Sequence, residues 1–310
     1  MVRFVIGRAA LPERKAIPSL SPPDQVKRSS GGIPRGKRRY IPIVAMPRNR
    51  AVELAKNAVW SLLPVQWRFI RRGKWLLSHG ERELQQLPYL VERGTVALDI
   101  GANEGRYTYA LTQVVGSKGR VISIEPVREL ARLVEISAQR LGLPVQVLNV
   151  ALSSESGVSS LFIPRHAGES VTGYASLHER SAYSFEQADA VERREVEIQT
   201  LDQVCSGIRE RISFIKIDVE GHELPVLKGG VETLTRHRPR MVIEIEQRHS
   251  PTPILDTFEY LKNLGFRGEF LDSFGRTRDI ADFDLVANQS AHLNAVEPAS
   301  YINNFIFHPL

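Results

Sequence analysis

An aspartate and two glycines stand where an apolar run ends, and together they could hold a positively charged ligand. In the segment LDIGANEG, Asp99 closes the run and Gly101 and Gly105 follow it. Glycine has no Cβ, so a ligand can come close to the backbone, and the helix expected next offers free N–H groups at its start. The G-x-x-x-G spacing differs from the G-x-G-x-x-G of dinucleotide sites. A carboxylate placed before the glycines would also repel a pyrophosphate, which favours a cationic ligand.

A second carboxylate, Glu125, closes the next apolar run, about twenty residues after the glycines. A carboxylate at that distance can accept hydrogen bonds from two ribose hydroxyls. The simpler alternative is an ordinary acidic residue near the start of a helix. Together with Asp99 and the glycines, Glu125 indicates S-adenosylmethionine, which has a ribose, an ammonium group and a sulfonium but no phosphate.

Four titratable residues crowd into a later segment, IKIDVEGHELPVLKGG. They are Asp218, Glu220, His222 and Glu223, and ionic groups are costly to crowd unless they are paired or used in chemistry. His222 is our first candidate for a general base, because a neutral imidazole accepts a proton near neutral pH, and Glu220 is the second. The alternative for His222 is a residue that opens a helix and packs without reacting.

Two further carboxylates, Glu244 and Glu246, lie at the end of another apolar run. With Asp218 or Glu220 they could bind a divalent cation, since carboxylate clusters suit Mg²⁺ or Ca²⁺. No Asp-Asn pair supplies an obvious further set of ligands, so the sequence predicts no metal site.

The elements that must position these residues alternate between apolar runs and helical stretches. Strands separated by helices of about 10–15 residues are typical of βαβ units and of a parallel sheet covered on both faces. The sequence therefore predicts a Rossmann-like α/β fold, a mostly parallel sheet with helices on both faces and a closing edge strand. The expected strands are residues 95–100, 120–125, 145–152, 212–220, 240–246, 266–272 and 303–309, and the expected helices are residues 106–115, 127–142, 222–237 and 254–265.

Two segments of the folded part lie outside this alternation. Residues 51–92 form a leading helical segment that holds all three tryptophans, and we expect it to pack on the main sheet, with a membrane surface or an acceptor pocket as alternatives. Residues 153–194 show no firm periodicity. A loop of that length usually acts as a lid or binding segment, and its start should lie near the carboxyl ends of the strands. We expect an acceptor lid inside a domain that spans residues 93–310.

The basic excess of the chain sits in residues 1–50. They carry 12 Lys and Arg against 2 acidic residues, whereas the other 260 residues carry 29 against 33. The segment is also rich in Pro, Ser and Gly, which predicts a disordered tail, with contact to an anionic membrane or to nucleic acid as functional alternatives. The single cysteine, Cys205, and the lack of a long apolar run favour a cytoplasmic protein that is at most peripheral to a membrane.

Several segments resemble, in the same order, those of FkbM-type methyltransferases, within the class I S-adenosylmethionine-dependent superfamily. The resemblance spans residues 91–246, and the closing NNFIFHP is also similar to the last strand of that family. It implies a seven-stranded sheet with the last strand antiparallel, S-adenosylmethionine as the cofactor, and methylation of an oxygen. The segments that carry it are LDIGANEG, ISIEP, TLD at Thr200–Asp202, IKIDVEGHELPVLKGG and VIEIE.

The resemblance also implies roles for particular residues. Asp218 would face the methionine part of the cofactor or the reaction centre, and Glu125 would hold the ribose. The end of the third strand would border the adenine, and the first glycine turn would hold the methionine end. The residues concerned are Asn149 and Val150 for the adenine, and Asp99, Gly101, Asn103 and Gly105 for the methionine end.

The expected acceptor is a hydroxyl of a sugar, a glycolipid or a secondary metabolite. A specific nucleic acid is not expected: base amino methylation usually involves an (Asn/Asp/Ser)-Pro-Pro-(Tyr/Phe) motif where this chain has DVEG, and cytosine C5 chemistry needs a cysteine after proline, whereas Cys205 follows Val204. The alternatives are a nitrogen or nucleic-acid acceptor, or a catalytically inactive cofactor-binding protein of the same fold. The sequence makes no prediction of oligomeric state.

Overall fold

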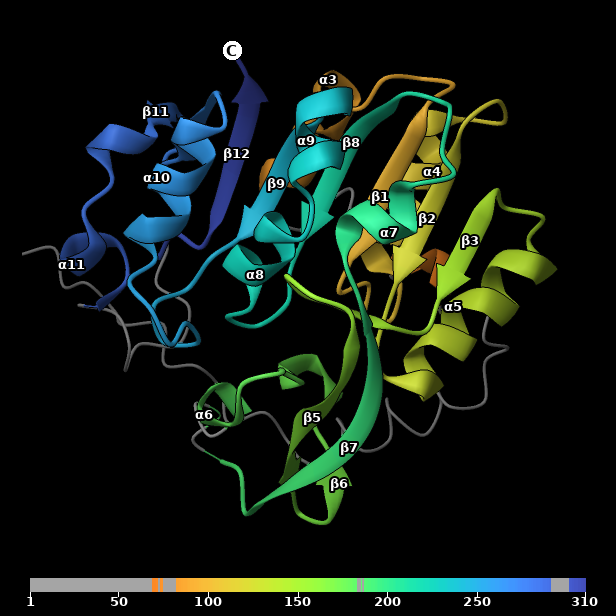
Figure 1. The fold of residues 1–310 in the computed structure, drawn as a ribbon, viewed down its shortest axis with the longest axis vertical. Coiled ribbons are helices and arrows are strands. Elements are labelled where there is room, and N and C mark those ends of the chain that lie inside the picture. The colour runs from red at the N-terminus through yellow and green to blue at the C-terminus, as the bar shows by residue number, and fades with distance from the viewer. Residues whose placement is uncertain (1–68, 72, 75–81, 183–184, 186, 291–300) are drawn as a thin grey trace, which may run out of the picture. The chain divides into compact units, whose positions relative to one another are not determined.

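The described residues form a main eight-stranded sheet, in the order β11-β10-β12-β9-β8-β1-β2-β3 (Figure 1). The structure is a computed structural model that describes residues 69–71, 73–74, 82–182, 185, 187–290 and 301–310. The strands of the sheet are β1 (Val96–Ile100), β2 (Arg120–Ile124), β3 (Val145–Leu148), β8 (Ile212–Ile217), β9 (Arg240–Glu244), β10 (Phe266–Leu271), β11 (Thr277–Asp279) and β12 (Asn304–Pro309).

The strands from β9 to β3 run parallel, and β12, β10 and β11 pair antiparallel. The prediction of a Rossmann-like, mostly parallel sheet is therefore confirmed. The expected number of seven strands was wrong by one, because β11 consists of three exposed residues with no apolar pattern to reveal it. The expected edge position of β12 was also wrong, since β12 lies between β9 and β10.

The side chains of β12 explain its interior position. Successive residues of a strand point to opposite faces of a sheet. Phe305 and Phe307 pack into the core cluster on one face, and Ile306 packs into the cluster on the other. A strand that is apolar on both faces buries the most surface when strands flank it on both sides.

Helices cover both faces of the sheet. The helix predicted over residues 222–237 is in fact two helices, separated at Gly229 and Gly230. At the start of the second helix, the carboxylate of Asp202 accepts hydrogen bonds from the N–H groups of Glu232 and Thr233. One face carries α3 (Leu87–Leu90), α4 (Arg106–Val115) and α5 (Arg128–Arg140), and the other carries α7 (Leu201–Cys205), α8 (Glu223–Lys228), α9 (Val231–His237) and α10 (Leu255–Asn263). The short helix α11 (Leu285–Asn288) precedes β12.

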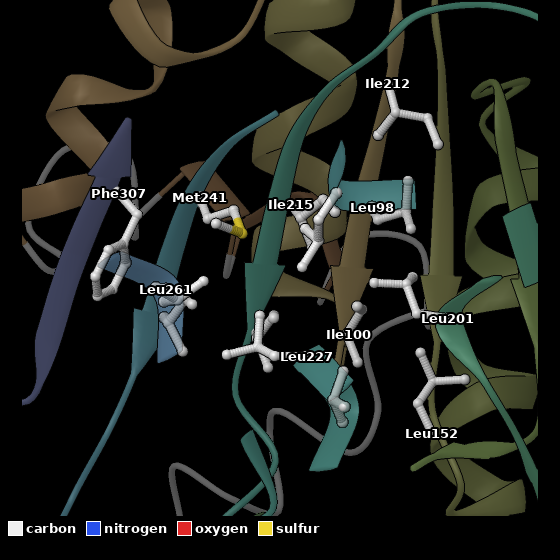
Figure 2. Close-up of a cluster of buried hydrophobic side chains, with 14 of the residues drawn as sticks. Leu98, Ile100, Leu152, Leu201, Ile212, Ile215, Leu227, Met241, Leu261 and Phe307 are labelled. Carbon is white, nitrogen blue, oxygen red and sulfur yellow. The ribbon is translucent and has the colours of Figure 1, made fainter. Parts of the chain in front are cut away.

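The larger core cluster lies between the sheet and helices α7 to α10 (Figure 2). In β1, Leu98 and Ile100 face this cluster, whereas Ala97 faces the cluster under α3 and α4. The same alternation places Ile215 on the first face and Phe214 on the second. The central strands are therefore apolar on both faces, and this matches the continuous apolar runs of the sequence.

Between β3 and β8 the chain forms a second, four-stranded sheet in the order β4-β7-β5-β6. We call residues 153–199 the insertion, and Figure 1 shows it at the end of the main sheet toward which β1, β2 and β8 point. The segment expected to be an unstructured loop thus contains a long hairpin. The strand β4 (Ala151–Leu152) leads into the insertion. The elements of the insertion are β5 (Gly157–His166), β6 (Glu169–Ser170), α6 (Glu179–Ala182) and β7 (Ala190–Gln199), with a 3-10 turn at Thr172–Tyr174.

The leading segment is described in part. Phe69 is buried and meets the ring of Tyr109 edge to face, with centroids 5.6 Å apart. A 3-10 turn at Arg82–Gln86 leads into α3. Trp60, Trp67, Trp75 and the whole of residues 1–50 lie outside the described residues. Within the described residues, no helix has the length and apolar character needed to cross a membrane.

The fold makes a prediction for β12. Phe305 is fully buried against Phe258, Phe270 and Phe283, so Phe305→Ala should lower the free energy of unfolding by about 3–5 kcal/mol. Phe274→Ala, at a ring that is 80% exposed, should change it by no more than about 0.5 kcal/mol. Urea unfolding of the two variants measures the difference, and equal midpoints would show that β12 is not a central strand.

Candidate functional site

Most of the predicted residues meet at the carboxyl edge of the main sheet. A cavity of about 600 Å³, open to solvent, lies there between the sheet and the insertion, and we call it the main cavity. The predicted residues that line it are Gly101, Asn103, Glu125, Val150, Asp218, Glu220 and His222.

Asp99 lines a second hollow beside the main cavity, together with Gly101 and Asp218. Its side chain is buried, and the hydroxyl of Thr108 donates a hydrogen bond to Oδ2 at 2.5 Å. Burial raises the pKa of Asp99 to about 6, although Thr108 and the nearby Lys216 oppose this shift. A cation in this hollow would favour the ionised carboxylate.

Two predicted residues support the site from behind. Gly105 begins α4 at φ +77°, and a Cβ there would lie 2.4 Å from the ring of Phe69, so this glycine is required by packing. The side-chain amide of Asn149 donates to the backbone carbonyls of Glu125 and Pro126 at 2.8 and 2.9 Å. Neither residue lines the main cavity, and both fix the turns that do.

The first glycine of the turn is needed for a contact between strands. Gly101 has φ +78°, and a Cβ there would lie 1.8 Å from the carbonyl oxygen of Asp218. The sequence suggested that this glycine leaves room for a ligand. In the structure the close neighbour is the turn after β8, so Gly101 allows the ends of β1 and β8 to come together.

Glu125 is buried at the end of β2, and its two carboxylate oxygens hold the neighbouring turns. Oε2 accepts from the N–H of Asn103 at 2.7 Å, and Oε1 accepts from the N–H of Val127 at 2.8 Å. A carboxylate has about four acceptor positions, so each oxygen keeps one for a ligand hydroxyl. Burial raises the pKa of Glu125 to about 7.

The turn after β8 has an unusual backbone. Glu220 has φ +51°, in the left-handed region that non-glycine residues rarely adopt, and Gly221 follows with φ +92°. A Cβ on Gly221 would lie 2.2 Å from the carbonyl oxygen of His249. The hydroxyl of Ser176, from the insertion, donates to the carbonyl of Glu220 at 2.7 Å. Such conformations persist where the surroundings enforce them, and they cluster at functional sites.

His222 is held on both sides of its ring. Nε2 lies 2.9 Å from the hydroxyl of Ser153, and Nδ1 lies 2.9 Å from Nε2 of His178 in the insertion. Burial, and then the neighbouring His178, lower the pKa of His222 to about 4. The imidazole is therefore neutral near pH 7, as a base must be, but both of its nitrogens already have partners.

A second hollow adjoins the main cavity, and Asp218 and Glu220 line both. We call it the acidic hollow. Burial, and then the charge of Asp218, raise the pKa of Glu220 well above its usual value, and burial raises that of Glu223 to about 7. A cationic ligand nearby would relieve the repulsion among these groups. The acidic hollow is lined by Asp218, Glu220, Gly221, Glu223, Glu244, Glu246 and His249.

The sequence did not single out His249 or Lys216. His249 lies in the loop after β9, with Nε2 at 3.3 Å from Oε2 of Glu220. The buried Lys216 has Nζ 3.1 Å from Oδ1 of Asn304, 3.8 Å from Glu244 and 5.0 Å from the centre of the Tyr107 ring. Lys216 lies on β8 two residues before Asp218, and His249 follows Glu246 by three residues. Their contacts with β12 and with the turn after β8 form only through the strand order, so the sequence did not reveal them.

Two carboxylates of the acidic hollow, Glu244 and Glu246, were the candidates for binding a divalent cation. Glu244 and Glu246 accept hydrogen bonds from the side-chain amide of Asn303 at 2.7 and 3.2 Å. Among the residues that the structure describes, no group of three or more His, Cys, Asp and Glu side chains has an arrangement that could hold a metal ion.

The sequence matches the family described as the methyltransferase FkbM domain over residues 99–267. Among solved structures, a methyltransferase FkbM from Methylobacillus flagellatus KT matches with a TM-score of 0.45 and 16% identity, over 84% of this chain and 59% of that one. The chain thus spans less than two thirds of that protein.

Two further solved structures are O-methyltransferases. A S-adenosylmethionine-dependent enzyme from Thermotoga maritima matches with a TM-score of 0.40 and 15% identity, over 77% of this chain and 71% of that one. An enzyme from Bacillus cereus in complex with S-adenosylhomocysteine matches with a TM-score of 0.39 and 17% identity, over 85% and 92%. No curated protein matches the chain.

The raised pKa of Glu125 predicts how stability changes with pH. Between its usual value of 4.5 and about 7, the folded protein binds a proton at Glu125 that the unfolded chain has lost. Stability from this group is therefore lost as pH rises through that window. The free energy of unfolding of Glu125→Gln minus that of the natural chain should increase by about 3 kcal/mol across it.

Urea unfolding at about pH 5 and about pH 8 measures this change, and histidine titrations common to both proteins cancel in the difference. Glu135→Gln, at an exposed site on α5, is the matched control and should show no pH-dependent difference. A flat difference for Glu125→Gln would mean that the carboxyl group titrates normally, and a difference that falls with pH would mean that folding lowers its pKa.

Proposed function

The chain belongs to the FkbM methyltransferase family, and on this premise we propose that it transfers a methyl group from S-adenosylmethionine to a hydroxyl oxygen of a sugar, a glycolipid or a secondary metabolite. The observation that supports this most is the junction of two spaces at Asp218 and Glu220. The main cavity suits the cofactor, and an acceptor would meet the methyl group at this junction.

The residues of the main cavity fit S-adenosylmethionine. Its apolar wall, which includes Val150, Leu152 and Leu161, suits an adenine ring, and the free acceptor positions of Glu125 suit ribose hydroxyls. Asp99 and Asp218 lie where the positively charged methionine end would be. The raised pKa of Asp99 fits this assignment, because a carboxyl that is costly to ionise alone gains from a bound cation.

The bound cofactor supplies the methyl group on a positively charged sulfur, and the transfer is an in-line displacement. The chain must hold the acceptor oxygen about 3–3.5 Å from the methyl carbon and exclude water. We assign the exclusion of water to the insertion, because Leu161, Gly173, Ser176 and Leu177 form one wall of the main cavity. The insertion would thus act as the acceptor lid.

A hydroxyl is a weak nucleophile until its proton is withdrawn, and a positioned base contributes about 10²–10⁴-fold. His222, Glu220 and Asp218 are the candidates for this part of the site. We assign Glu220 as the base that accepts this proton, because its carboxylate lines both spaces. His222 then holds the insertion through His178, since both of its ring nitrogens are engaged. Asp218 faces the methionine part.

The proposed function also includes the kind of acceptor, the compartment and a contact with a membrane. The acceptor is a small molecule or a glycan, and we expect the reaction in the cytoplasm. Residues 1–50 would add peripheral contact with an anionic membrane through their excess of Lys and Arg.

Cofactor affinity tests the role of Glu125. Hydrogen bonds to charged groups contribute about 1.5–3 kcal/mol, so Glu125→Gln should weaken S-adenosylmethionine binding by about 10–100-fold. Isothermal titration calorimetry measures the affinity, with Glu135→Gln as the control that should bind like the natural chain. Unchanged affinity of Glu125→Gln would remove the ribose assignment.

Label transfer tests the reaction itself. Purified protein is incubated with methyl-labelled S-adenosylmethionine and with separated cell fractions of glycans, lipids, metabolites and nucleic acids. We expect label in a glycan, lipid or metabolite fraction, with the methyl group on oxygen by mass spectrometry. Label on nitrogen or on nucleic acid would replace the proposed acceptor class, and no transfer to any fraction would count against an active enzyme.

A further inference from the structure

We infer that His249 positions Glu220 as the proton acceptor of the reaction, and that the insertion assembles this pair through Ser176 and Ser181. The inference rests on the proposed function, because it assigns a part in methyl transfer. In the step concerned, the acceptor oxygen takes the methyl group as its proton passes to the Glu220 carboxylate. The electron pair of the broken carbon–sulfur bond stays on sulfur.

The two side chains differ in their access to the cavities. Glu220 keeps 21% of its side-chain surface and lines both the main cavity and the acidic hollow, whereas His249 keeps 4% and lines only the acidic hollow. An acceptor at the junction would therefore touch Glu220. His249 stands behind it, with Nε2 at 3.3 Å from Oε2 of Glu220.

The hydrogen on the His249 ring has a defined place. Nε2 faces two carboxylate oxygens, at 3.3 Å from Glu220 and at 3.7 Å from Glu246. Burial lowers the pKa of His249 to about 4, so the ring is neutral near pH 7 and has one N–H group. With carboxylate oxygens facing Nε2, we place the hydrogen of the neutral ring on that nitrogen.

Glu246 is largely committed to other donors. The hydroxyl of Tyr301 donates to its Oε2 at 2.5 Å, Asn303 donates to its Oε1, and Arg248 forms an ion pair with it. Glu220 is the nearer acceptor for His249 and makes no such set of bonds. Because Nε2 of His249 lies nearer to Glu220 than to Glu246, we assign its N–H to Glu220, where it would favour the ionised carboxylate and fix its direction.

Two hydroxyls of the insertion fix the backbone on both sides of the pair. Ser176 donates to the carbonyl of Glu220 at 2.7 Å, and Ser181 donates to the carbonyl of His249 at 2.5 Å. The same carbonyl of His249 would meet a Cβ on Gly221 at 2.2 Å, so the two loops pack backbone to backbone. The left-handed conformation of Glu220 is thereby enforced from the insertion and from the loop after β9.

The charges around Glu220 set the direction of its pH dependence. On its own turn it faces Asp218 and Glu223, and across from it lie Glu246, Arg248 and His249. From the insertion, the uncharged hydroxyl of Ser176 donates a hydrogen bond to the backbone carbonyl of Glu220. Among these groups His249 supplies a neutral N–H donor, so its loss should raise the pKa at which Glu220 ionises.

The test compares His249→Phe with His249→Gln, because glutamine keeps an N–H donor and phenylalanine does not. Rates of methyl transfer are measured with the labelled fraction as acceptor across a range of pH. His249→Phe should lower kcat by about 100-fold and move the acid limb of its pH profile upward. His249→Gln should recover most of kcat and restore the limb. His308→Phe, which removes a similar pairing with Glu269 on the far strands, should match the natural chain.

Calorimetry of S-adenosylmethionine binding separates this role from a general loss of the site, since all of these variants should bind it like the natural chain. A kcat and a pH limb of His249→Phe equal to those of the natural chain would overturn the inference and leave the proposed function intact. No transfer by the natural chain would overturn both.

If His249→Phe fails to fold, a second variant tests the inference. Ser176→Ala combined with Ser181→Ala removes the two hydroxyls of the insertion and leaves every ring and charge in place. It should lower kcat by about tenfold, with cofactor affinity unchanged. If this double variant had the same kcat as the natural chain, the insertion would not assemble the pair.

Discussion

The candidate site depends on the crowding of carboxyl groups around Asp218. Strands β1, β2 and β8 end side by side and bring Asp99, Glu125 and Glu220 to the same edge. The charge of Asp218 raises the pKa of each of them, in addition to the larger effect of burial. Crowded carboxyl groups are costly in a stable fold unless they serve a ligand. A cation is the ligand that lowers this cost, and a sulfonium is such a cation.

The second constraint is the closeness of the loops at this edge. Gly101 touches the carbonyl of Asp218, and Gly221 touches that of His249, so the loops after β1, β8 and β9 are fixed relative to one another by backbone contacts. The insertion adds hydrogen bonds from Ser176, His178 and Ser181 to these loops. The main cavity and the acidic hollow are therefore held together as one unit, and under the proposed function a change in the insertion should affect transfer more than cofactor binding.

Much of this arrangement could be predicted from the sequence, because it depends on local pattern. The apolar runs gave the central strands, and the acidic residue that closes each run marked the carboxyl edge of the sheet. Asp99, Glu125 and Asp218 were found in this way, since parallel strands bring their ends together whatever the loops do.

What the sequence could not provide depends on contacts between distant segments. The place of β12, between β9 and β10, and the hairpin of the insertion are set by packing on both faces and by pairing of polar strands. His249 stayed hidden because nothing near it in the chain marks it as different from a surface histidine. Its partner is Glu220, in the turn after β8, and only the close approach at Gly221 brings the two together.

A crystal structure of the protein with S-adenosylhomocysteine tests the central claim most directly. The account predicts the adenine against Val150, the ribose hydroxyls on Glu125 and the sulfur beside Asp218, with the space over Glu220 left open for an acceptor. A ligand bound away from the carboxyl edge, or one whose sulfur points away from Asp218 and Glu220, would contradict it.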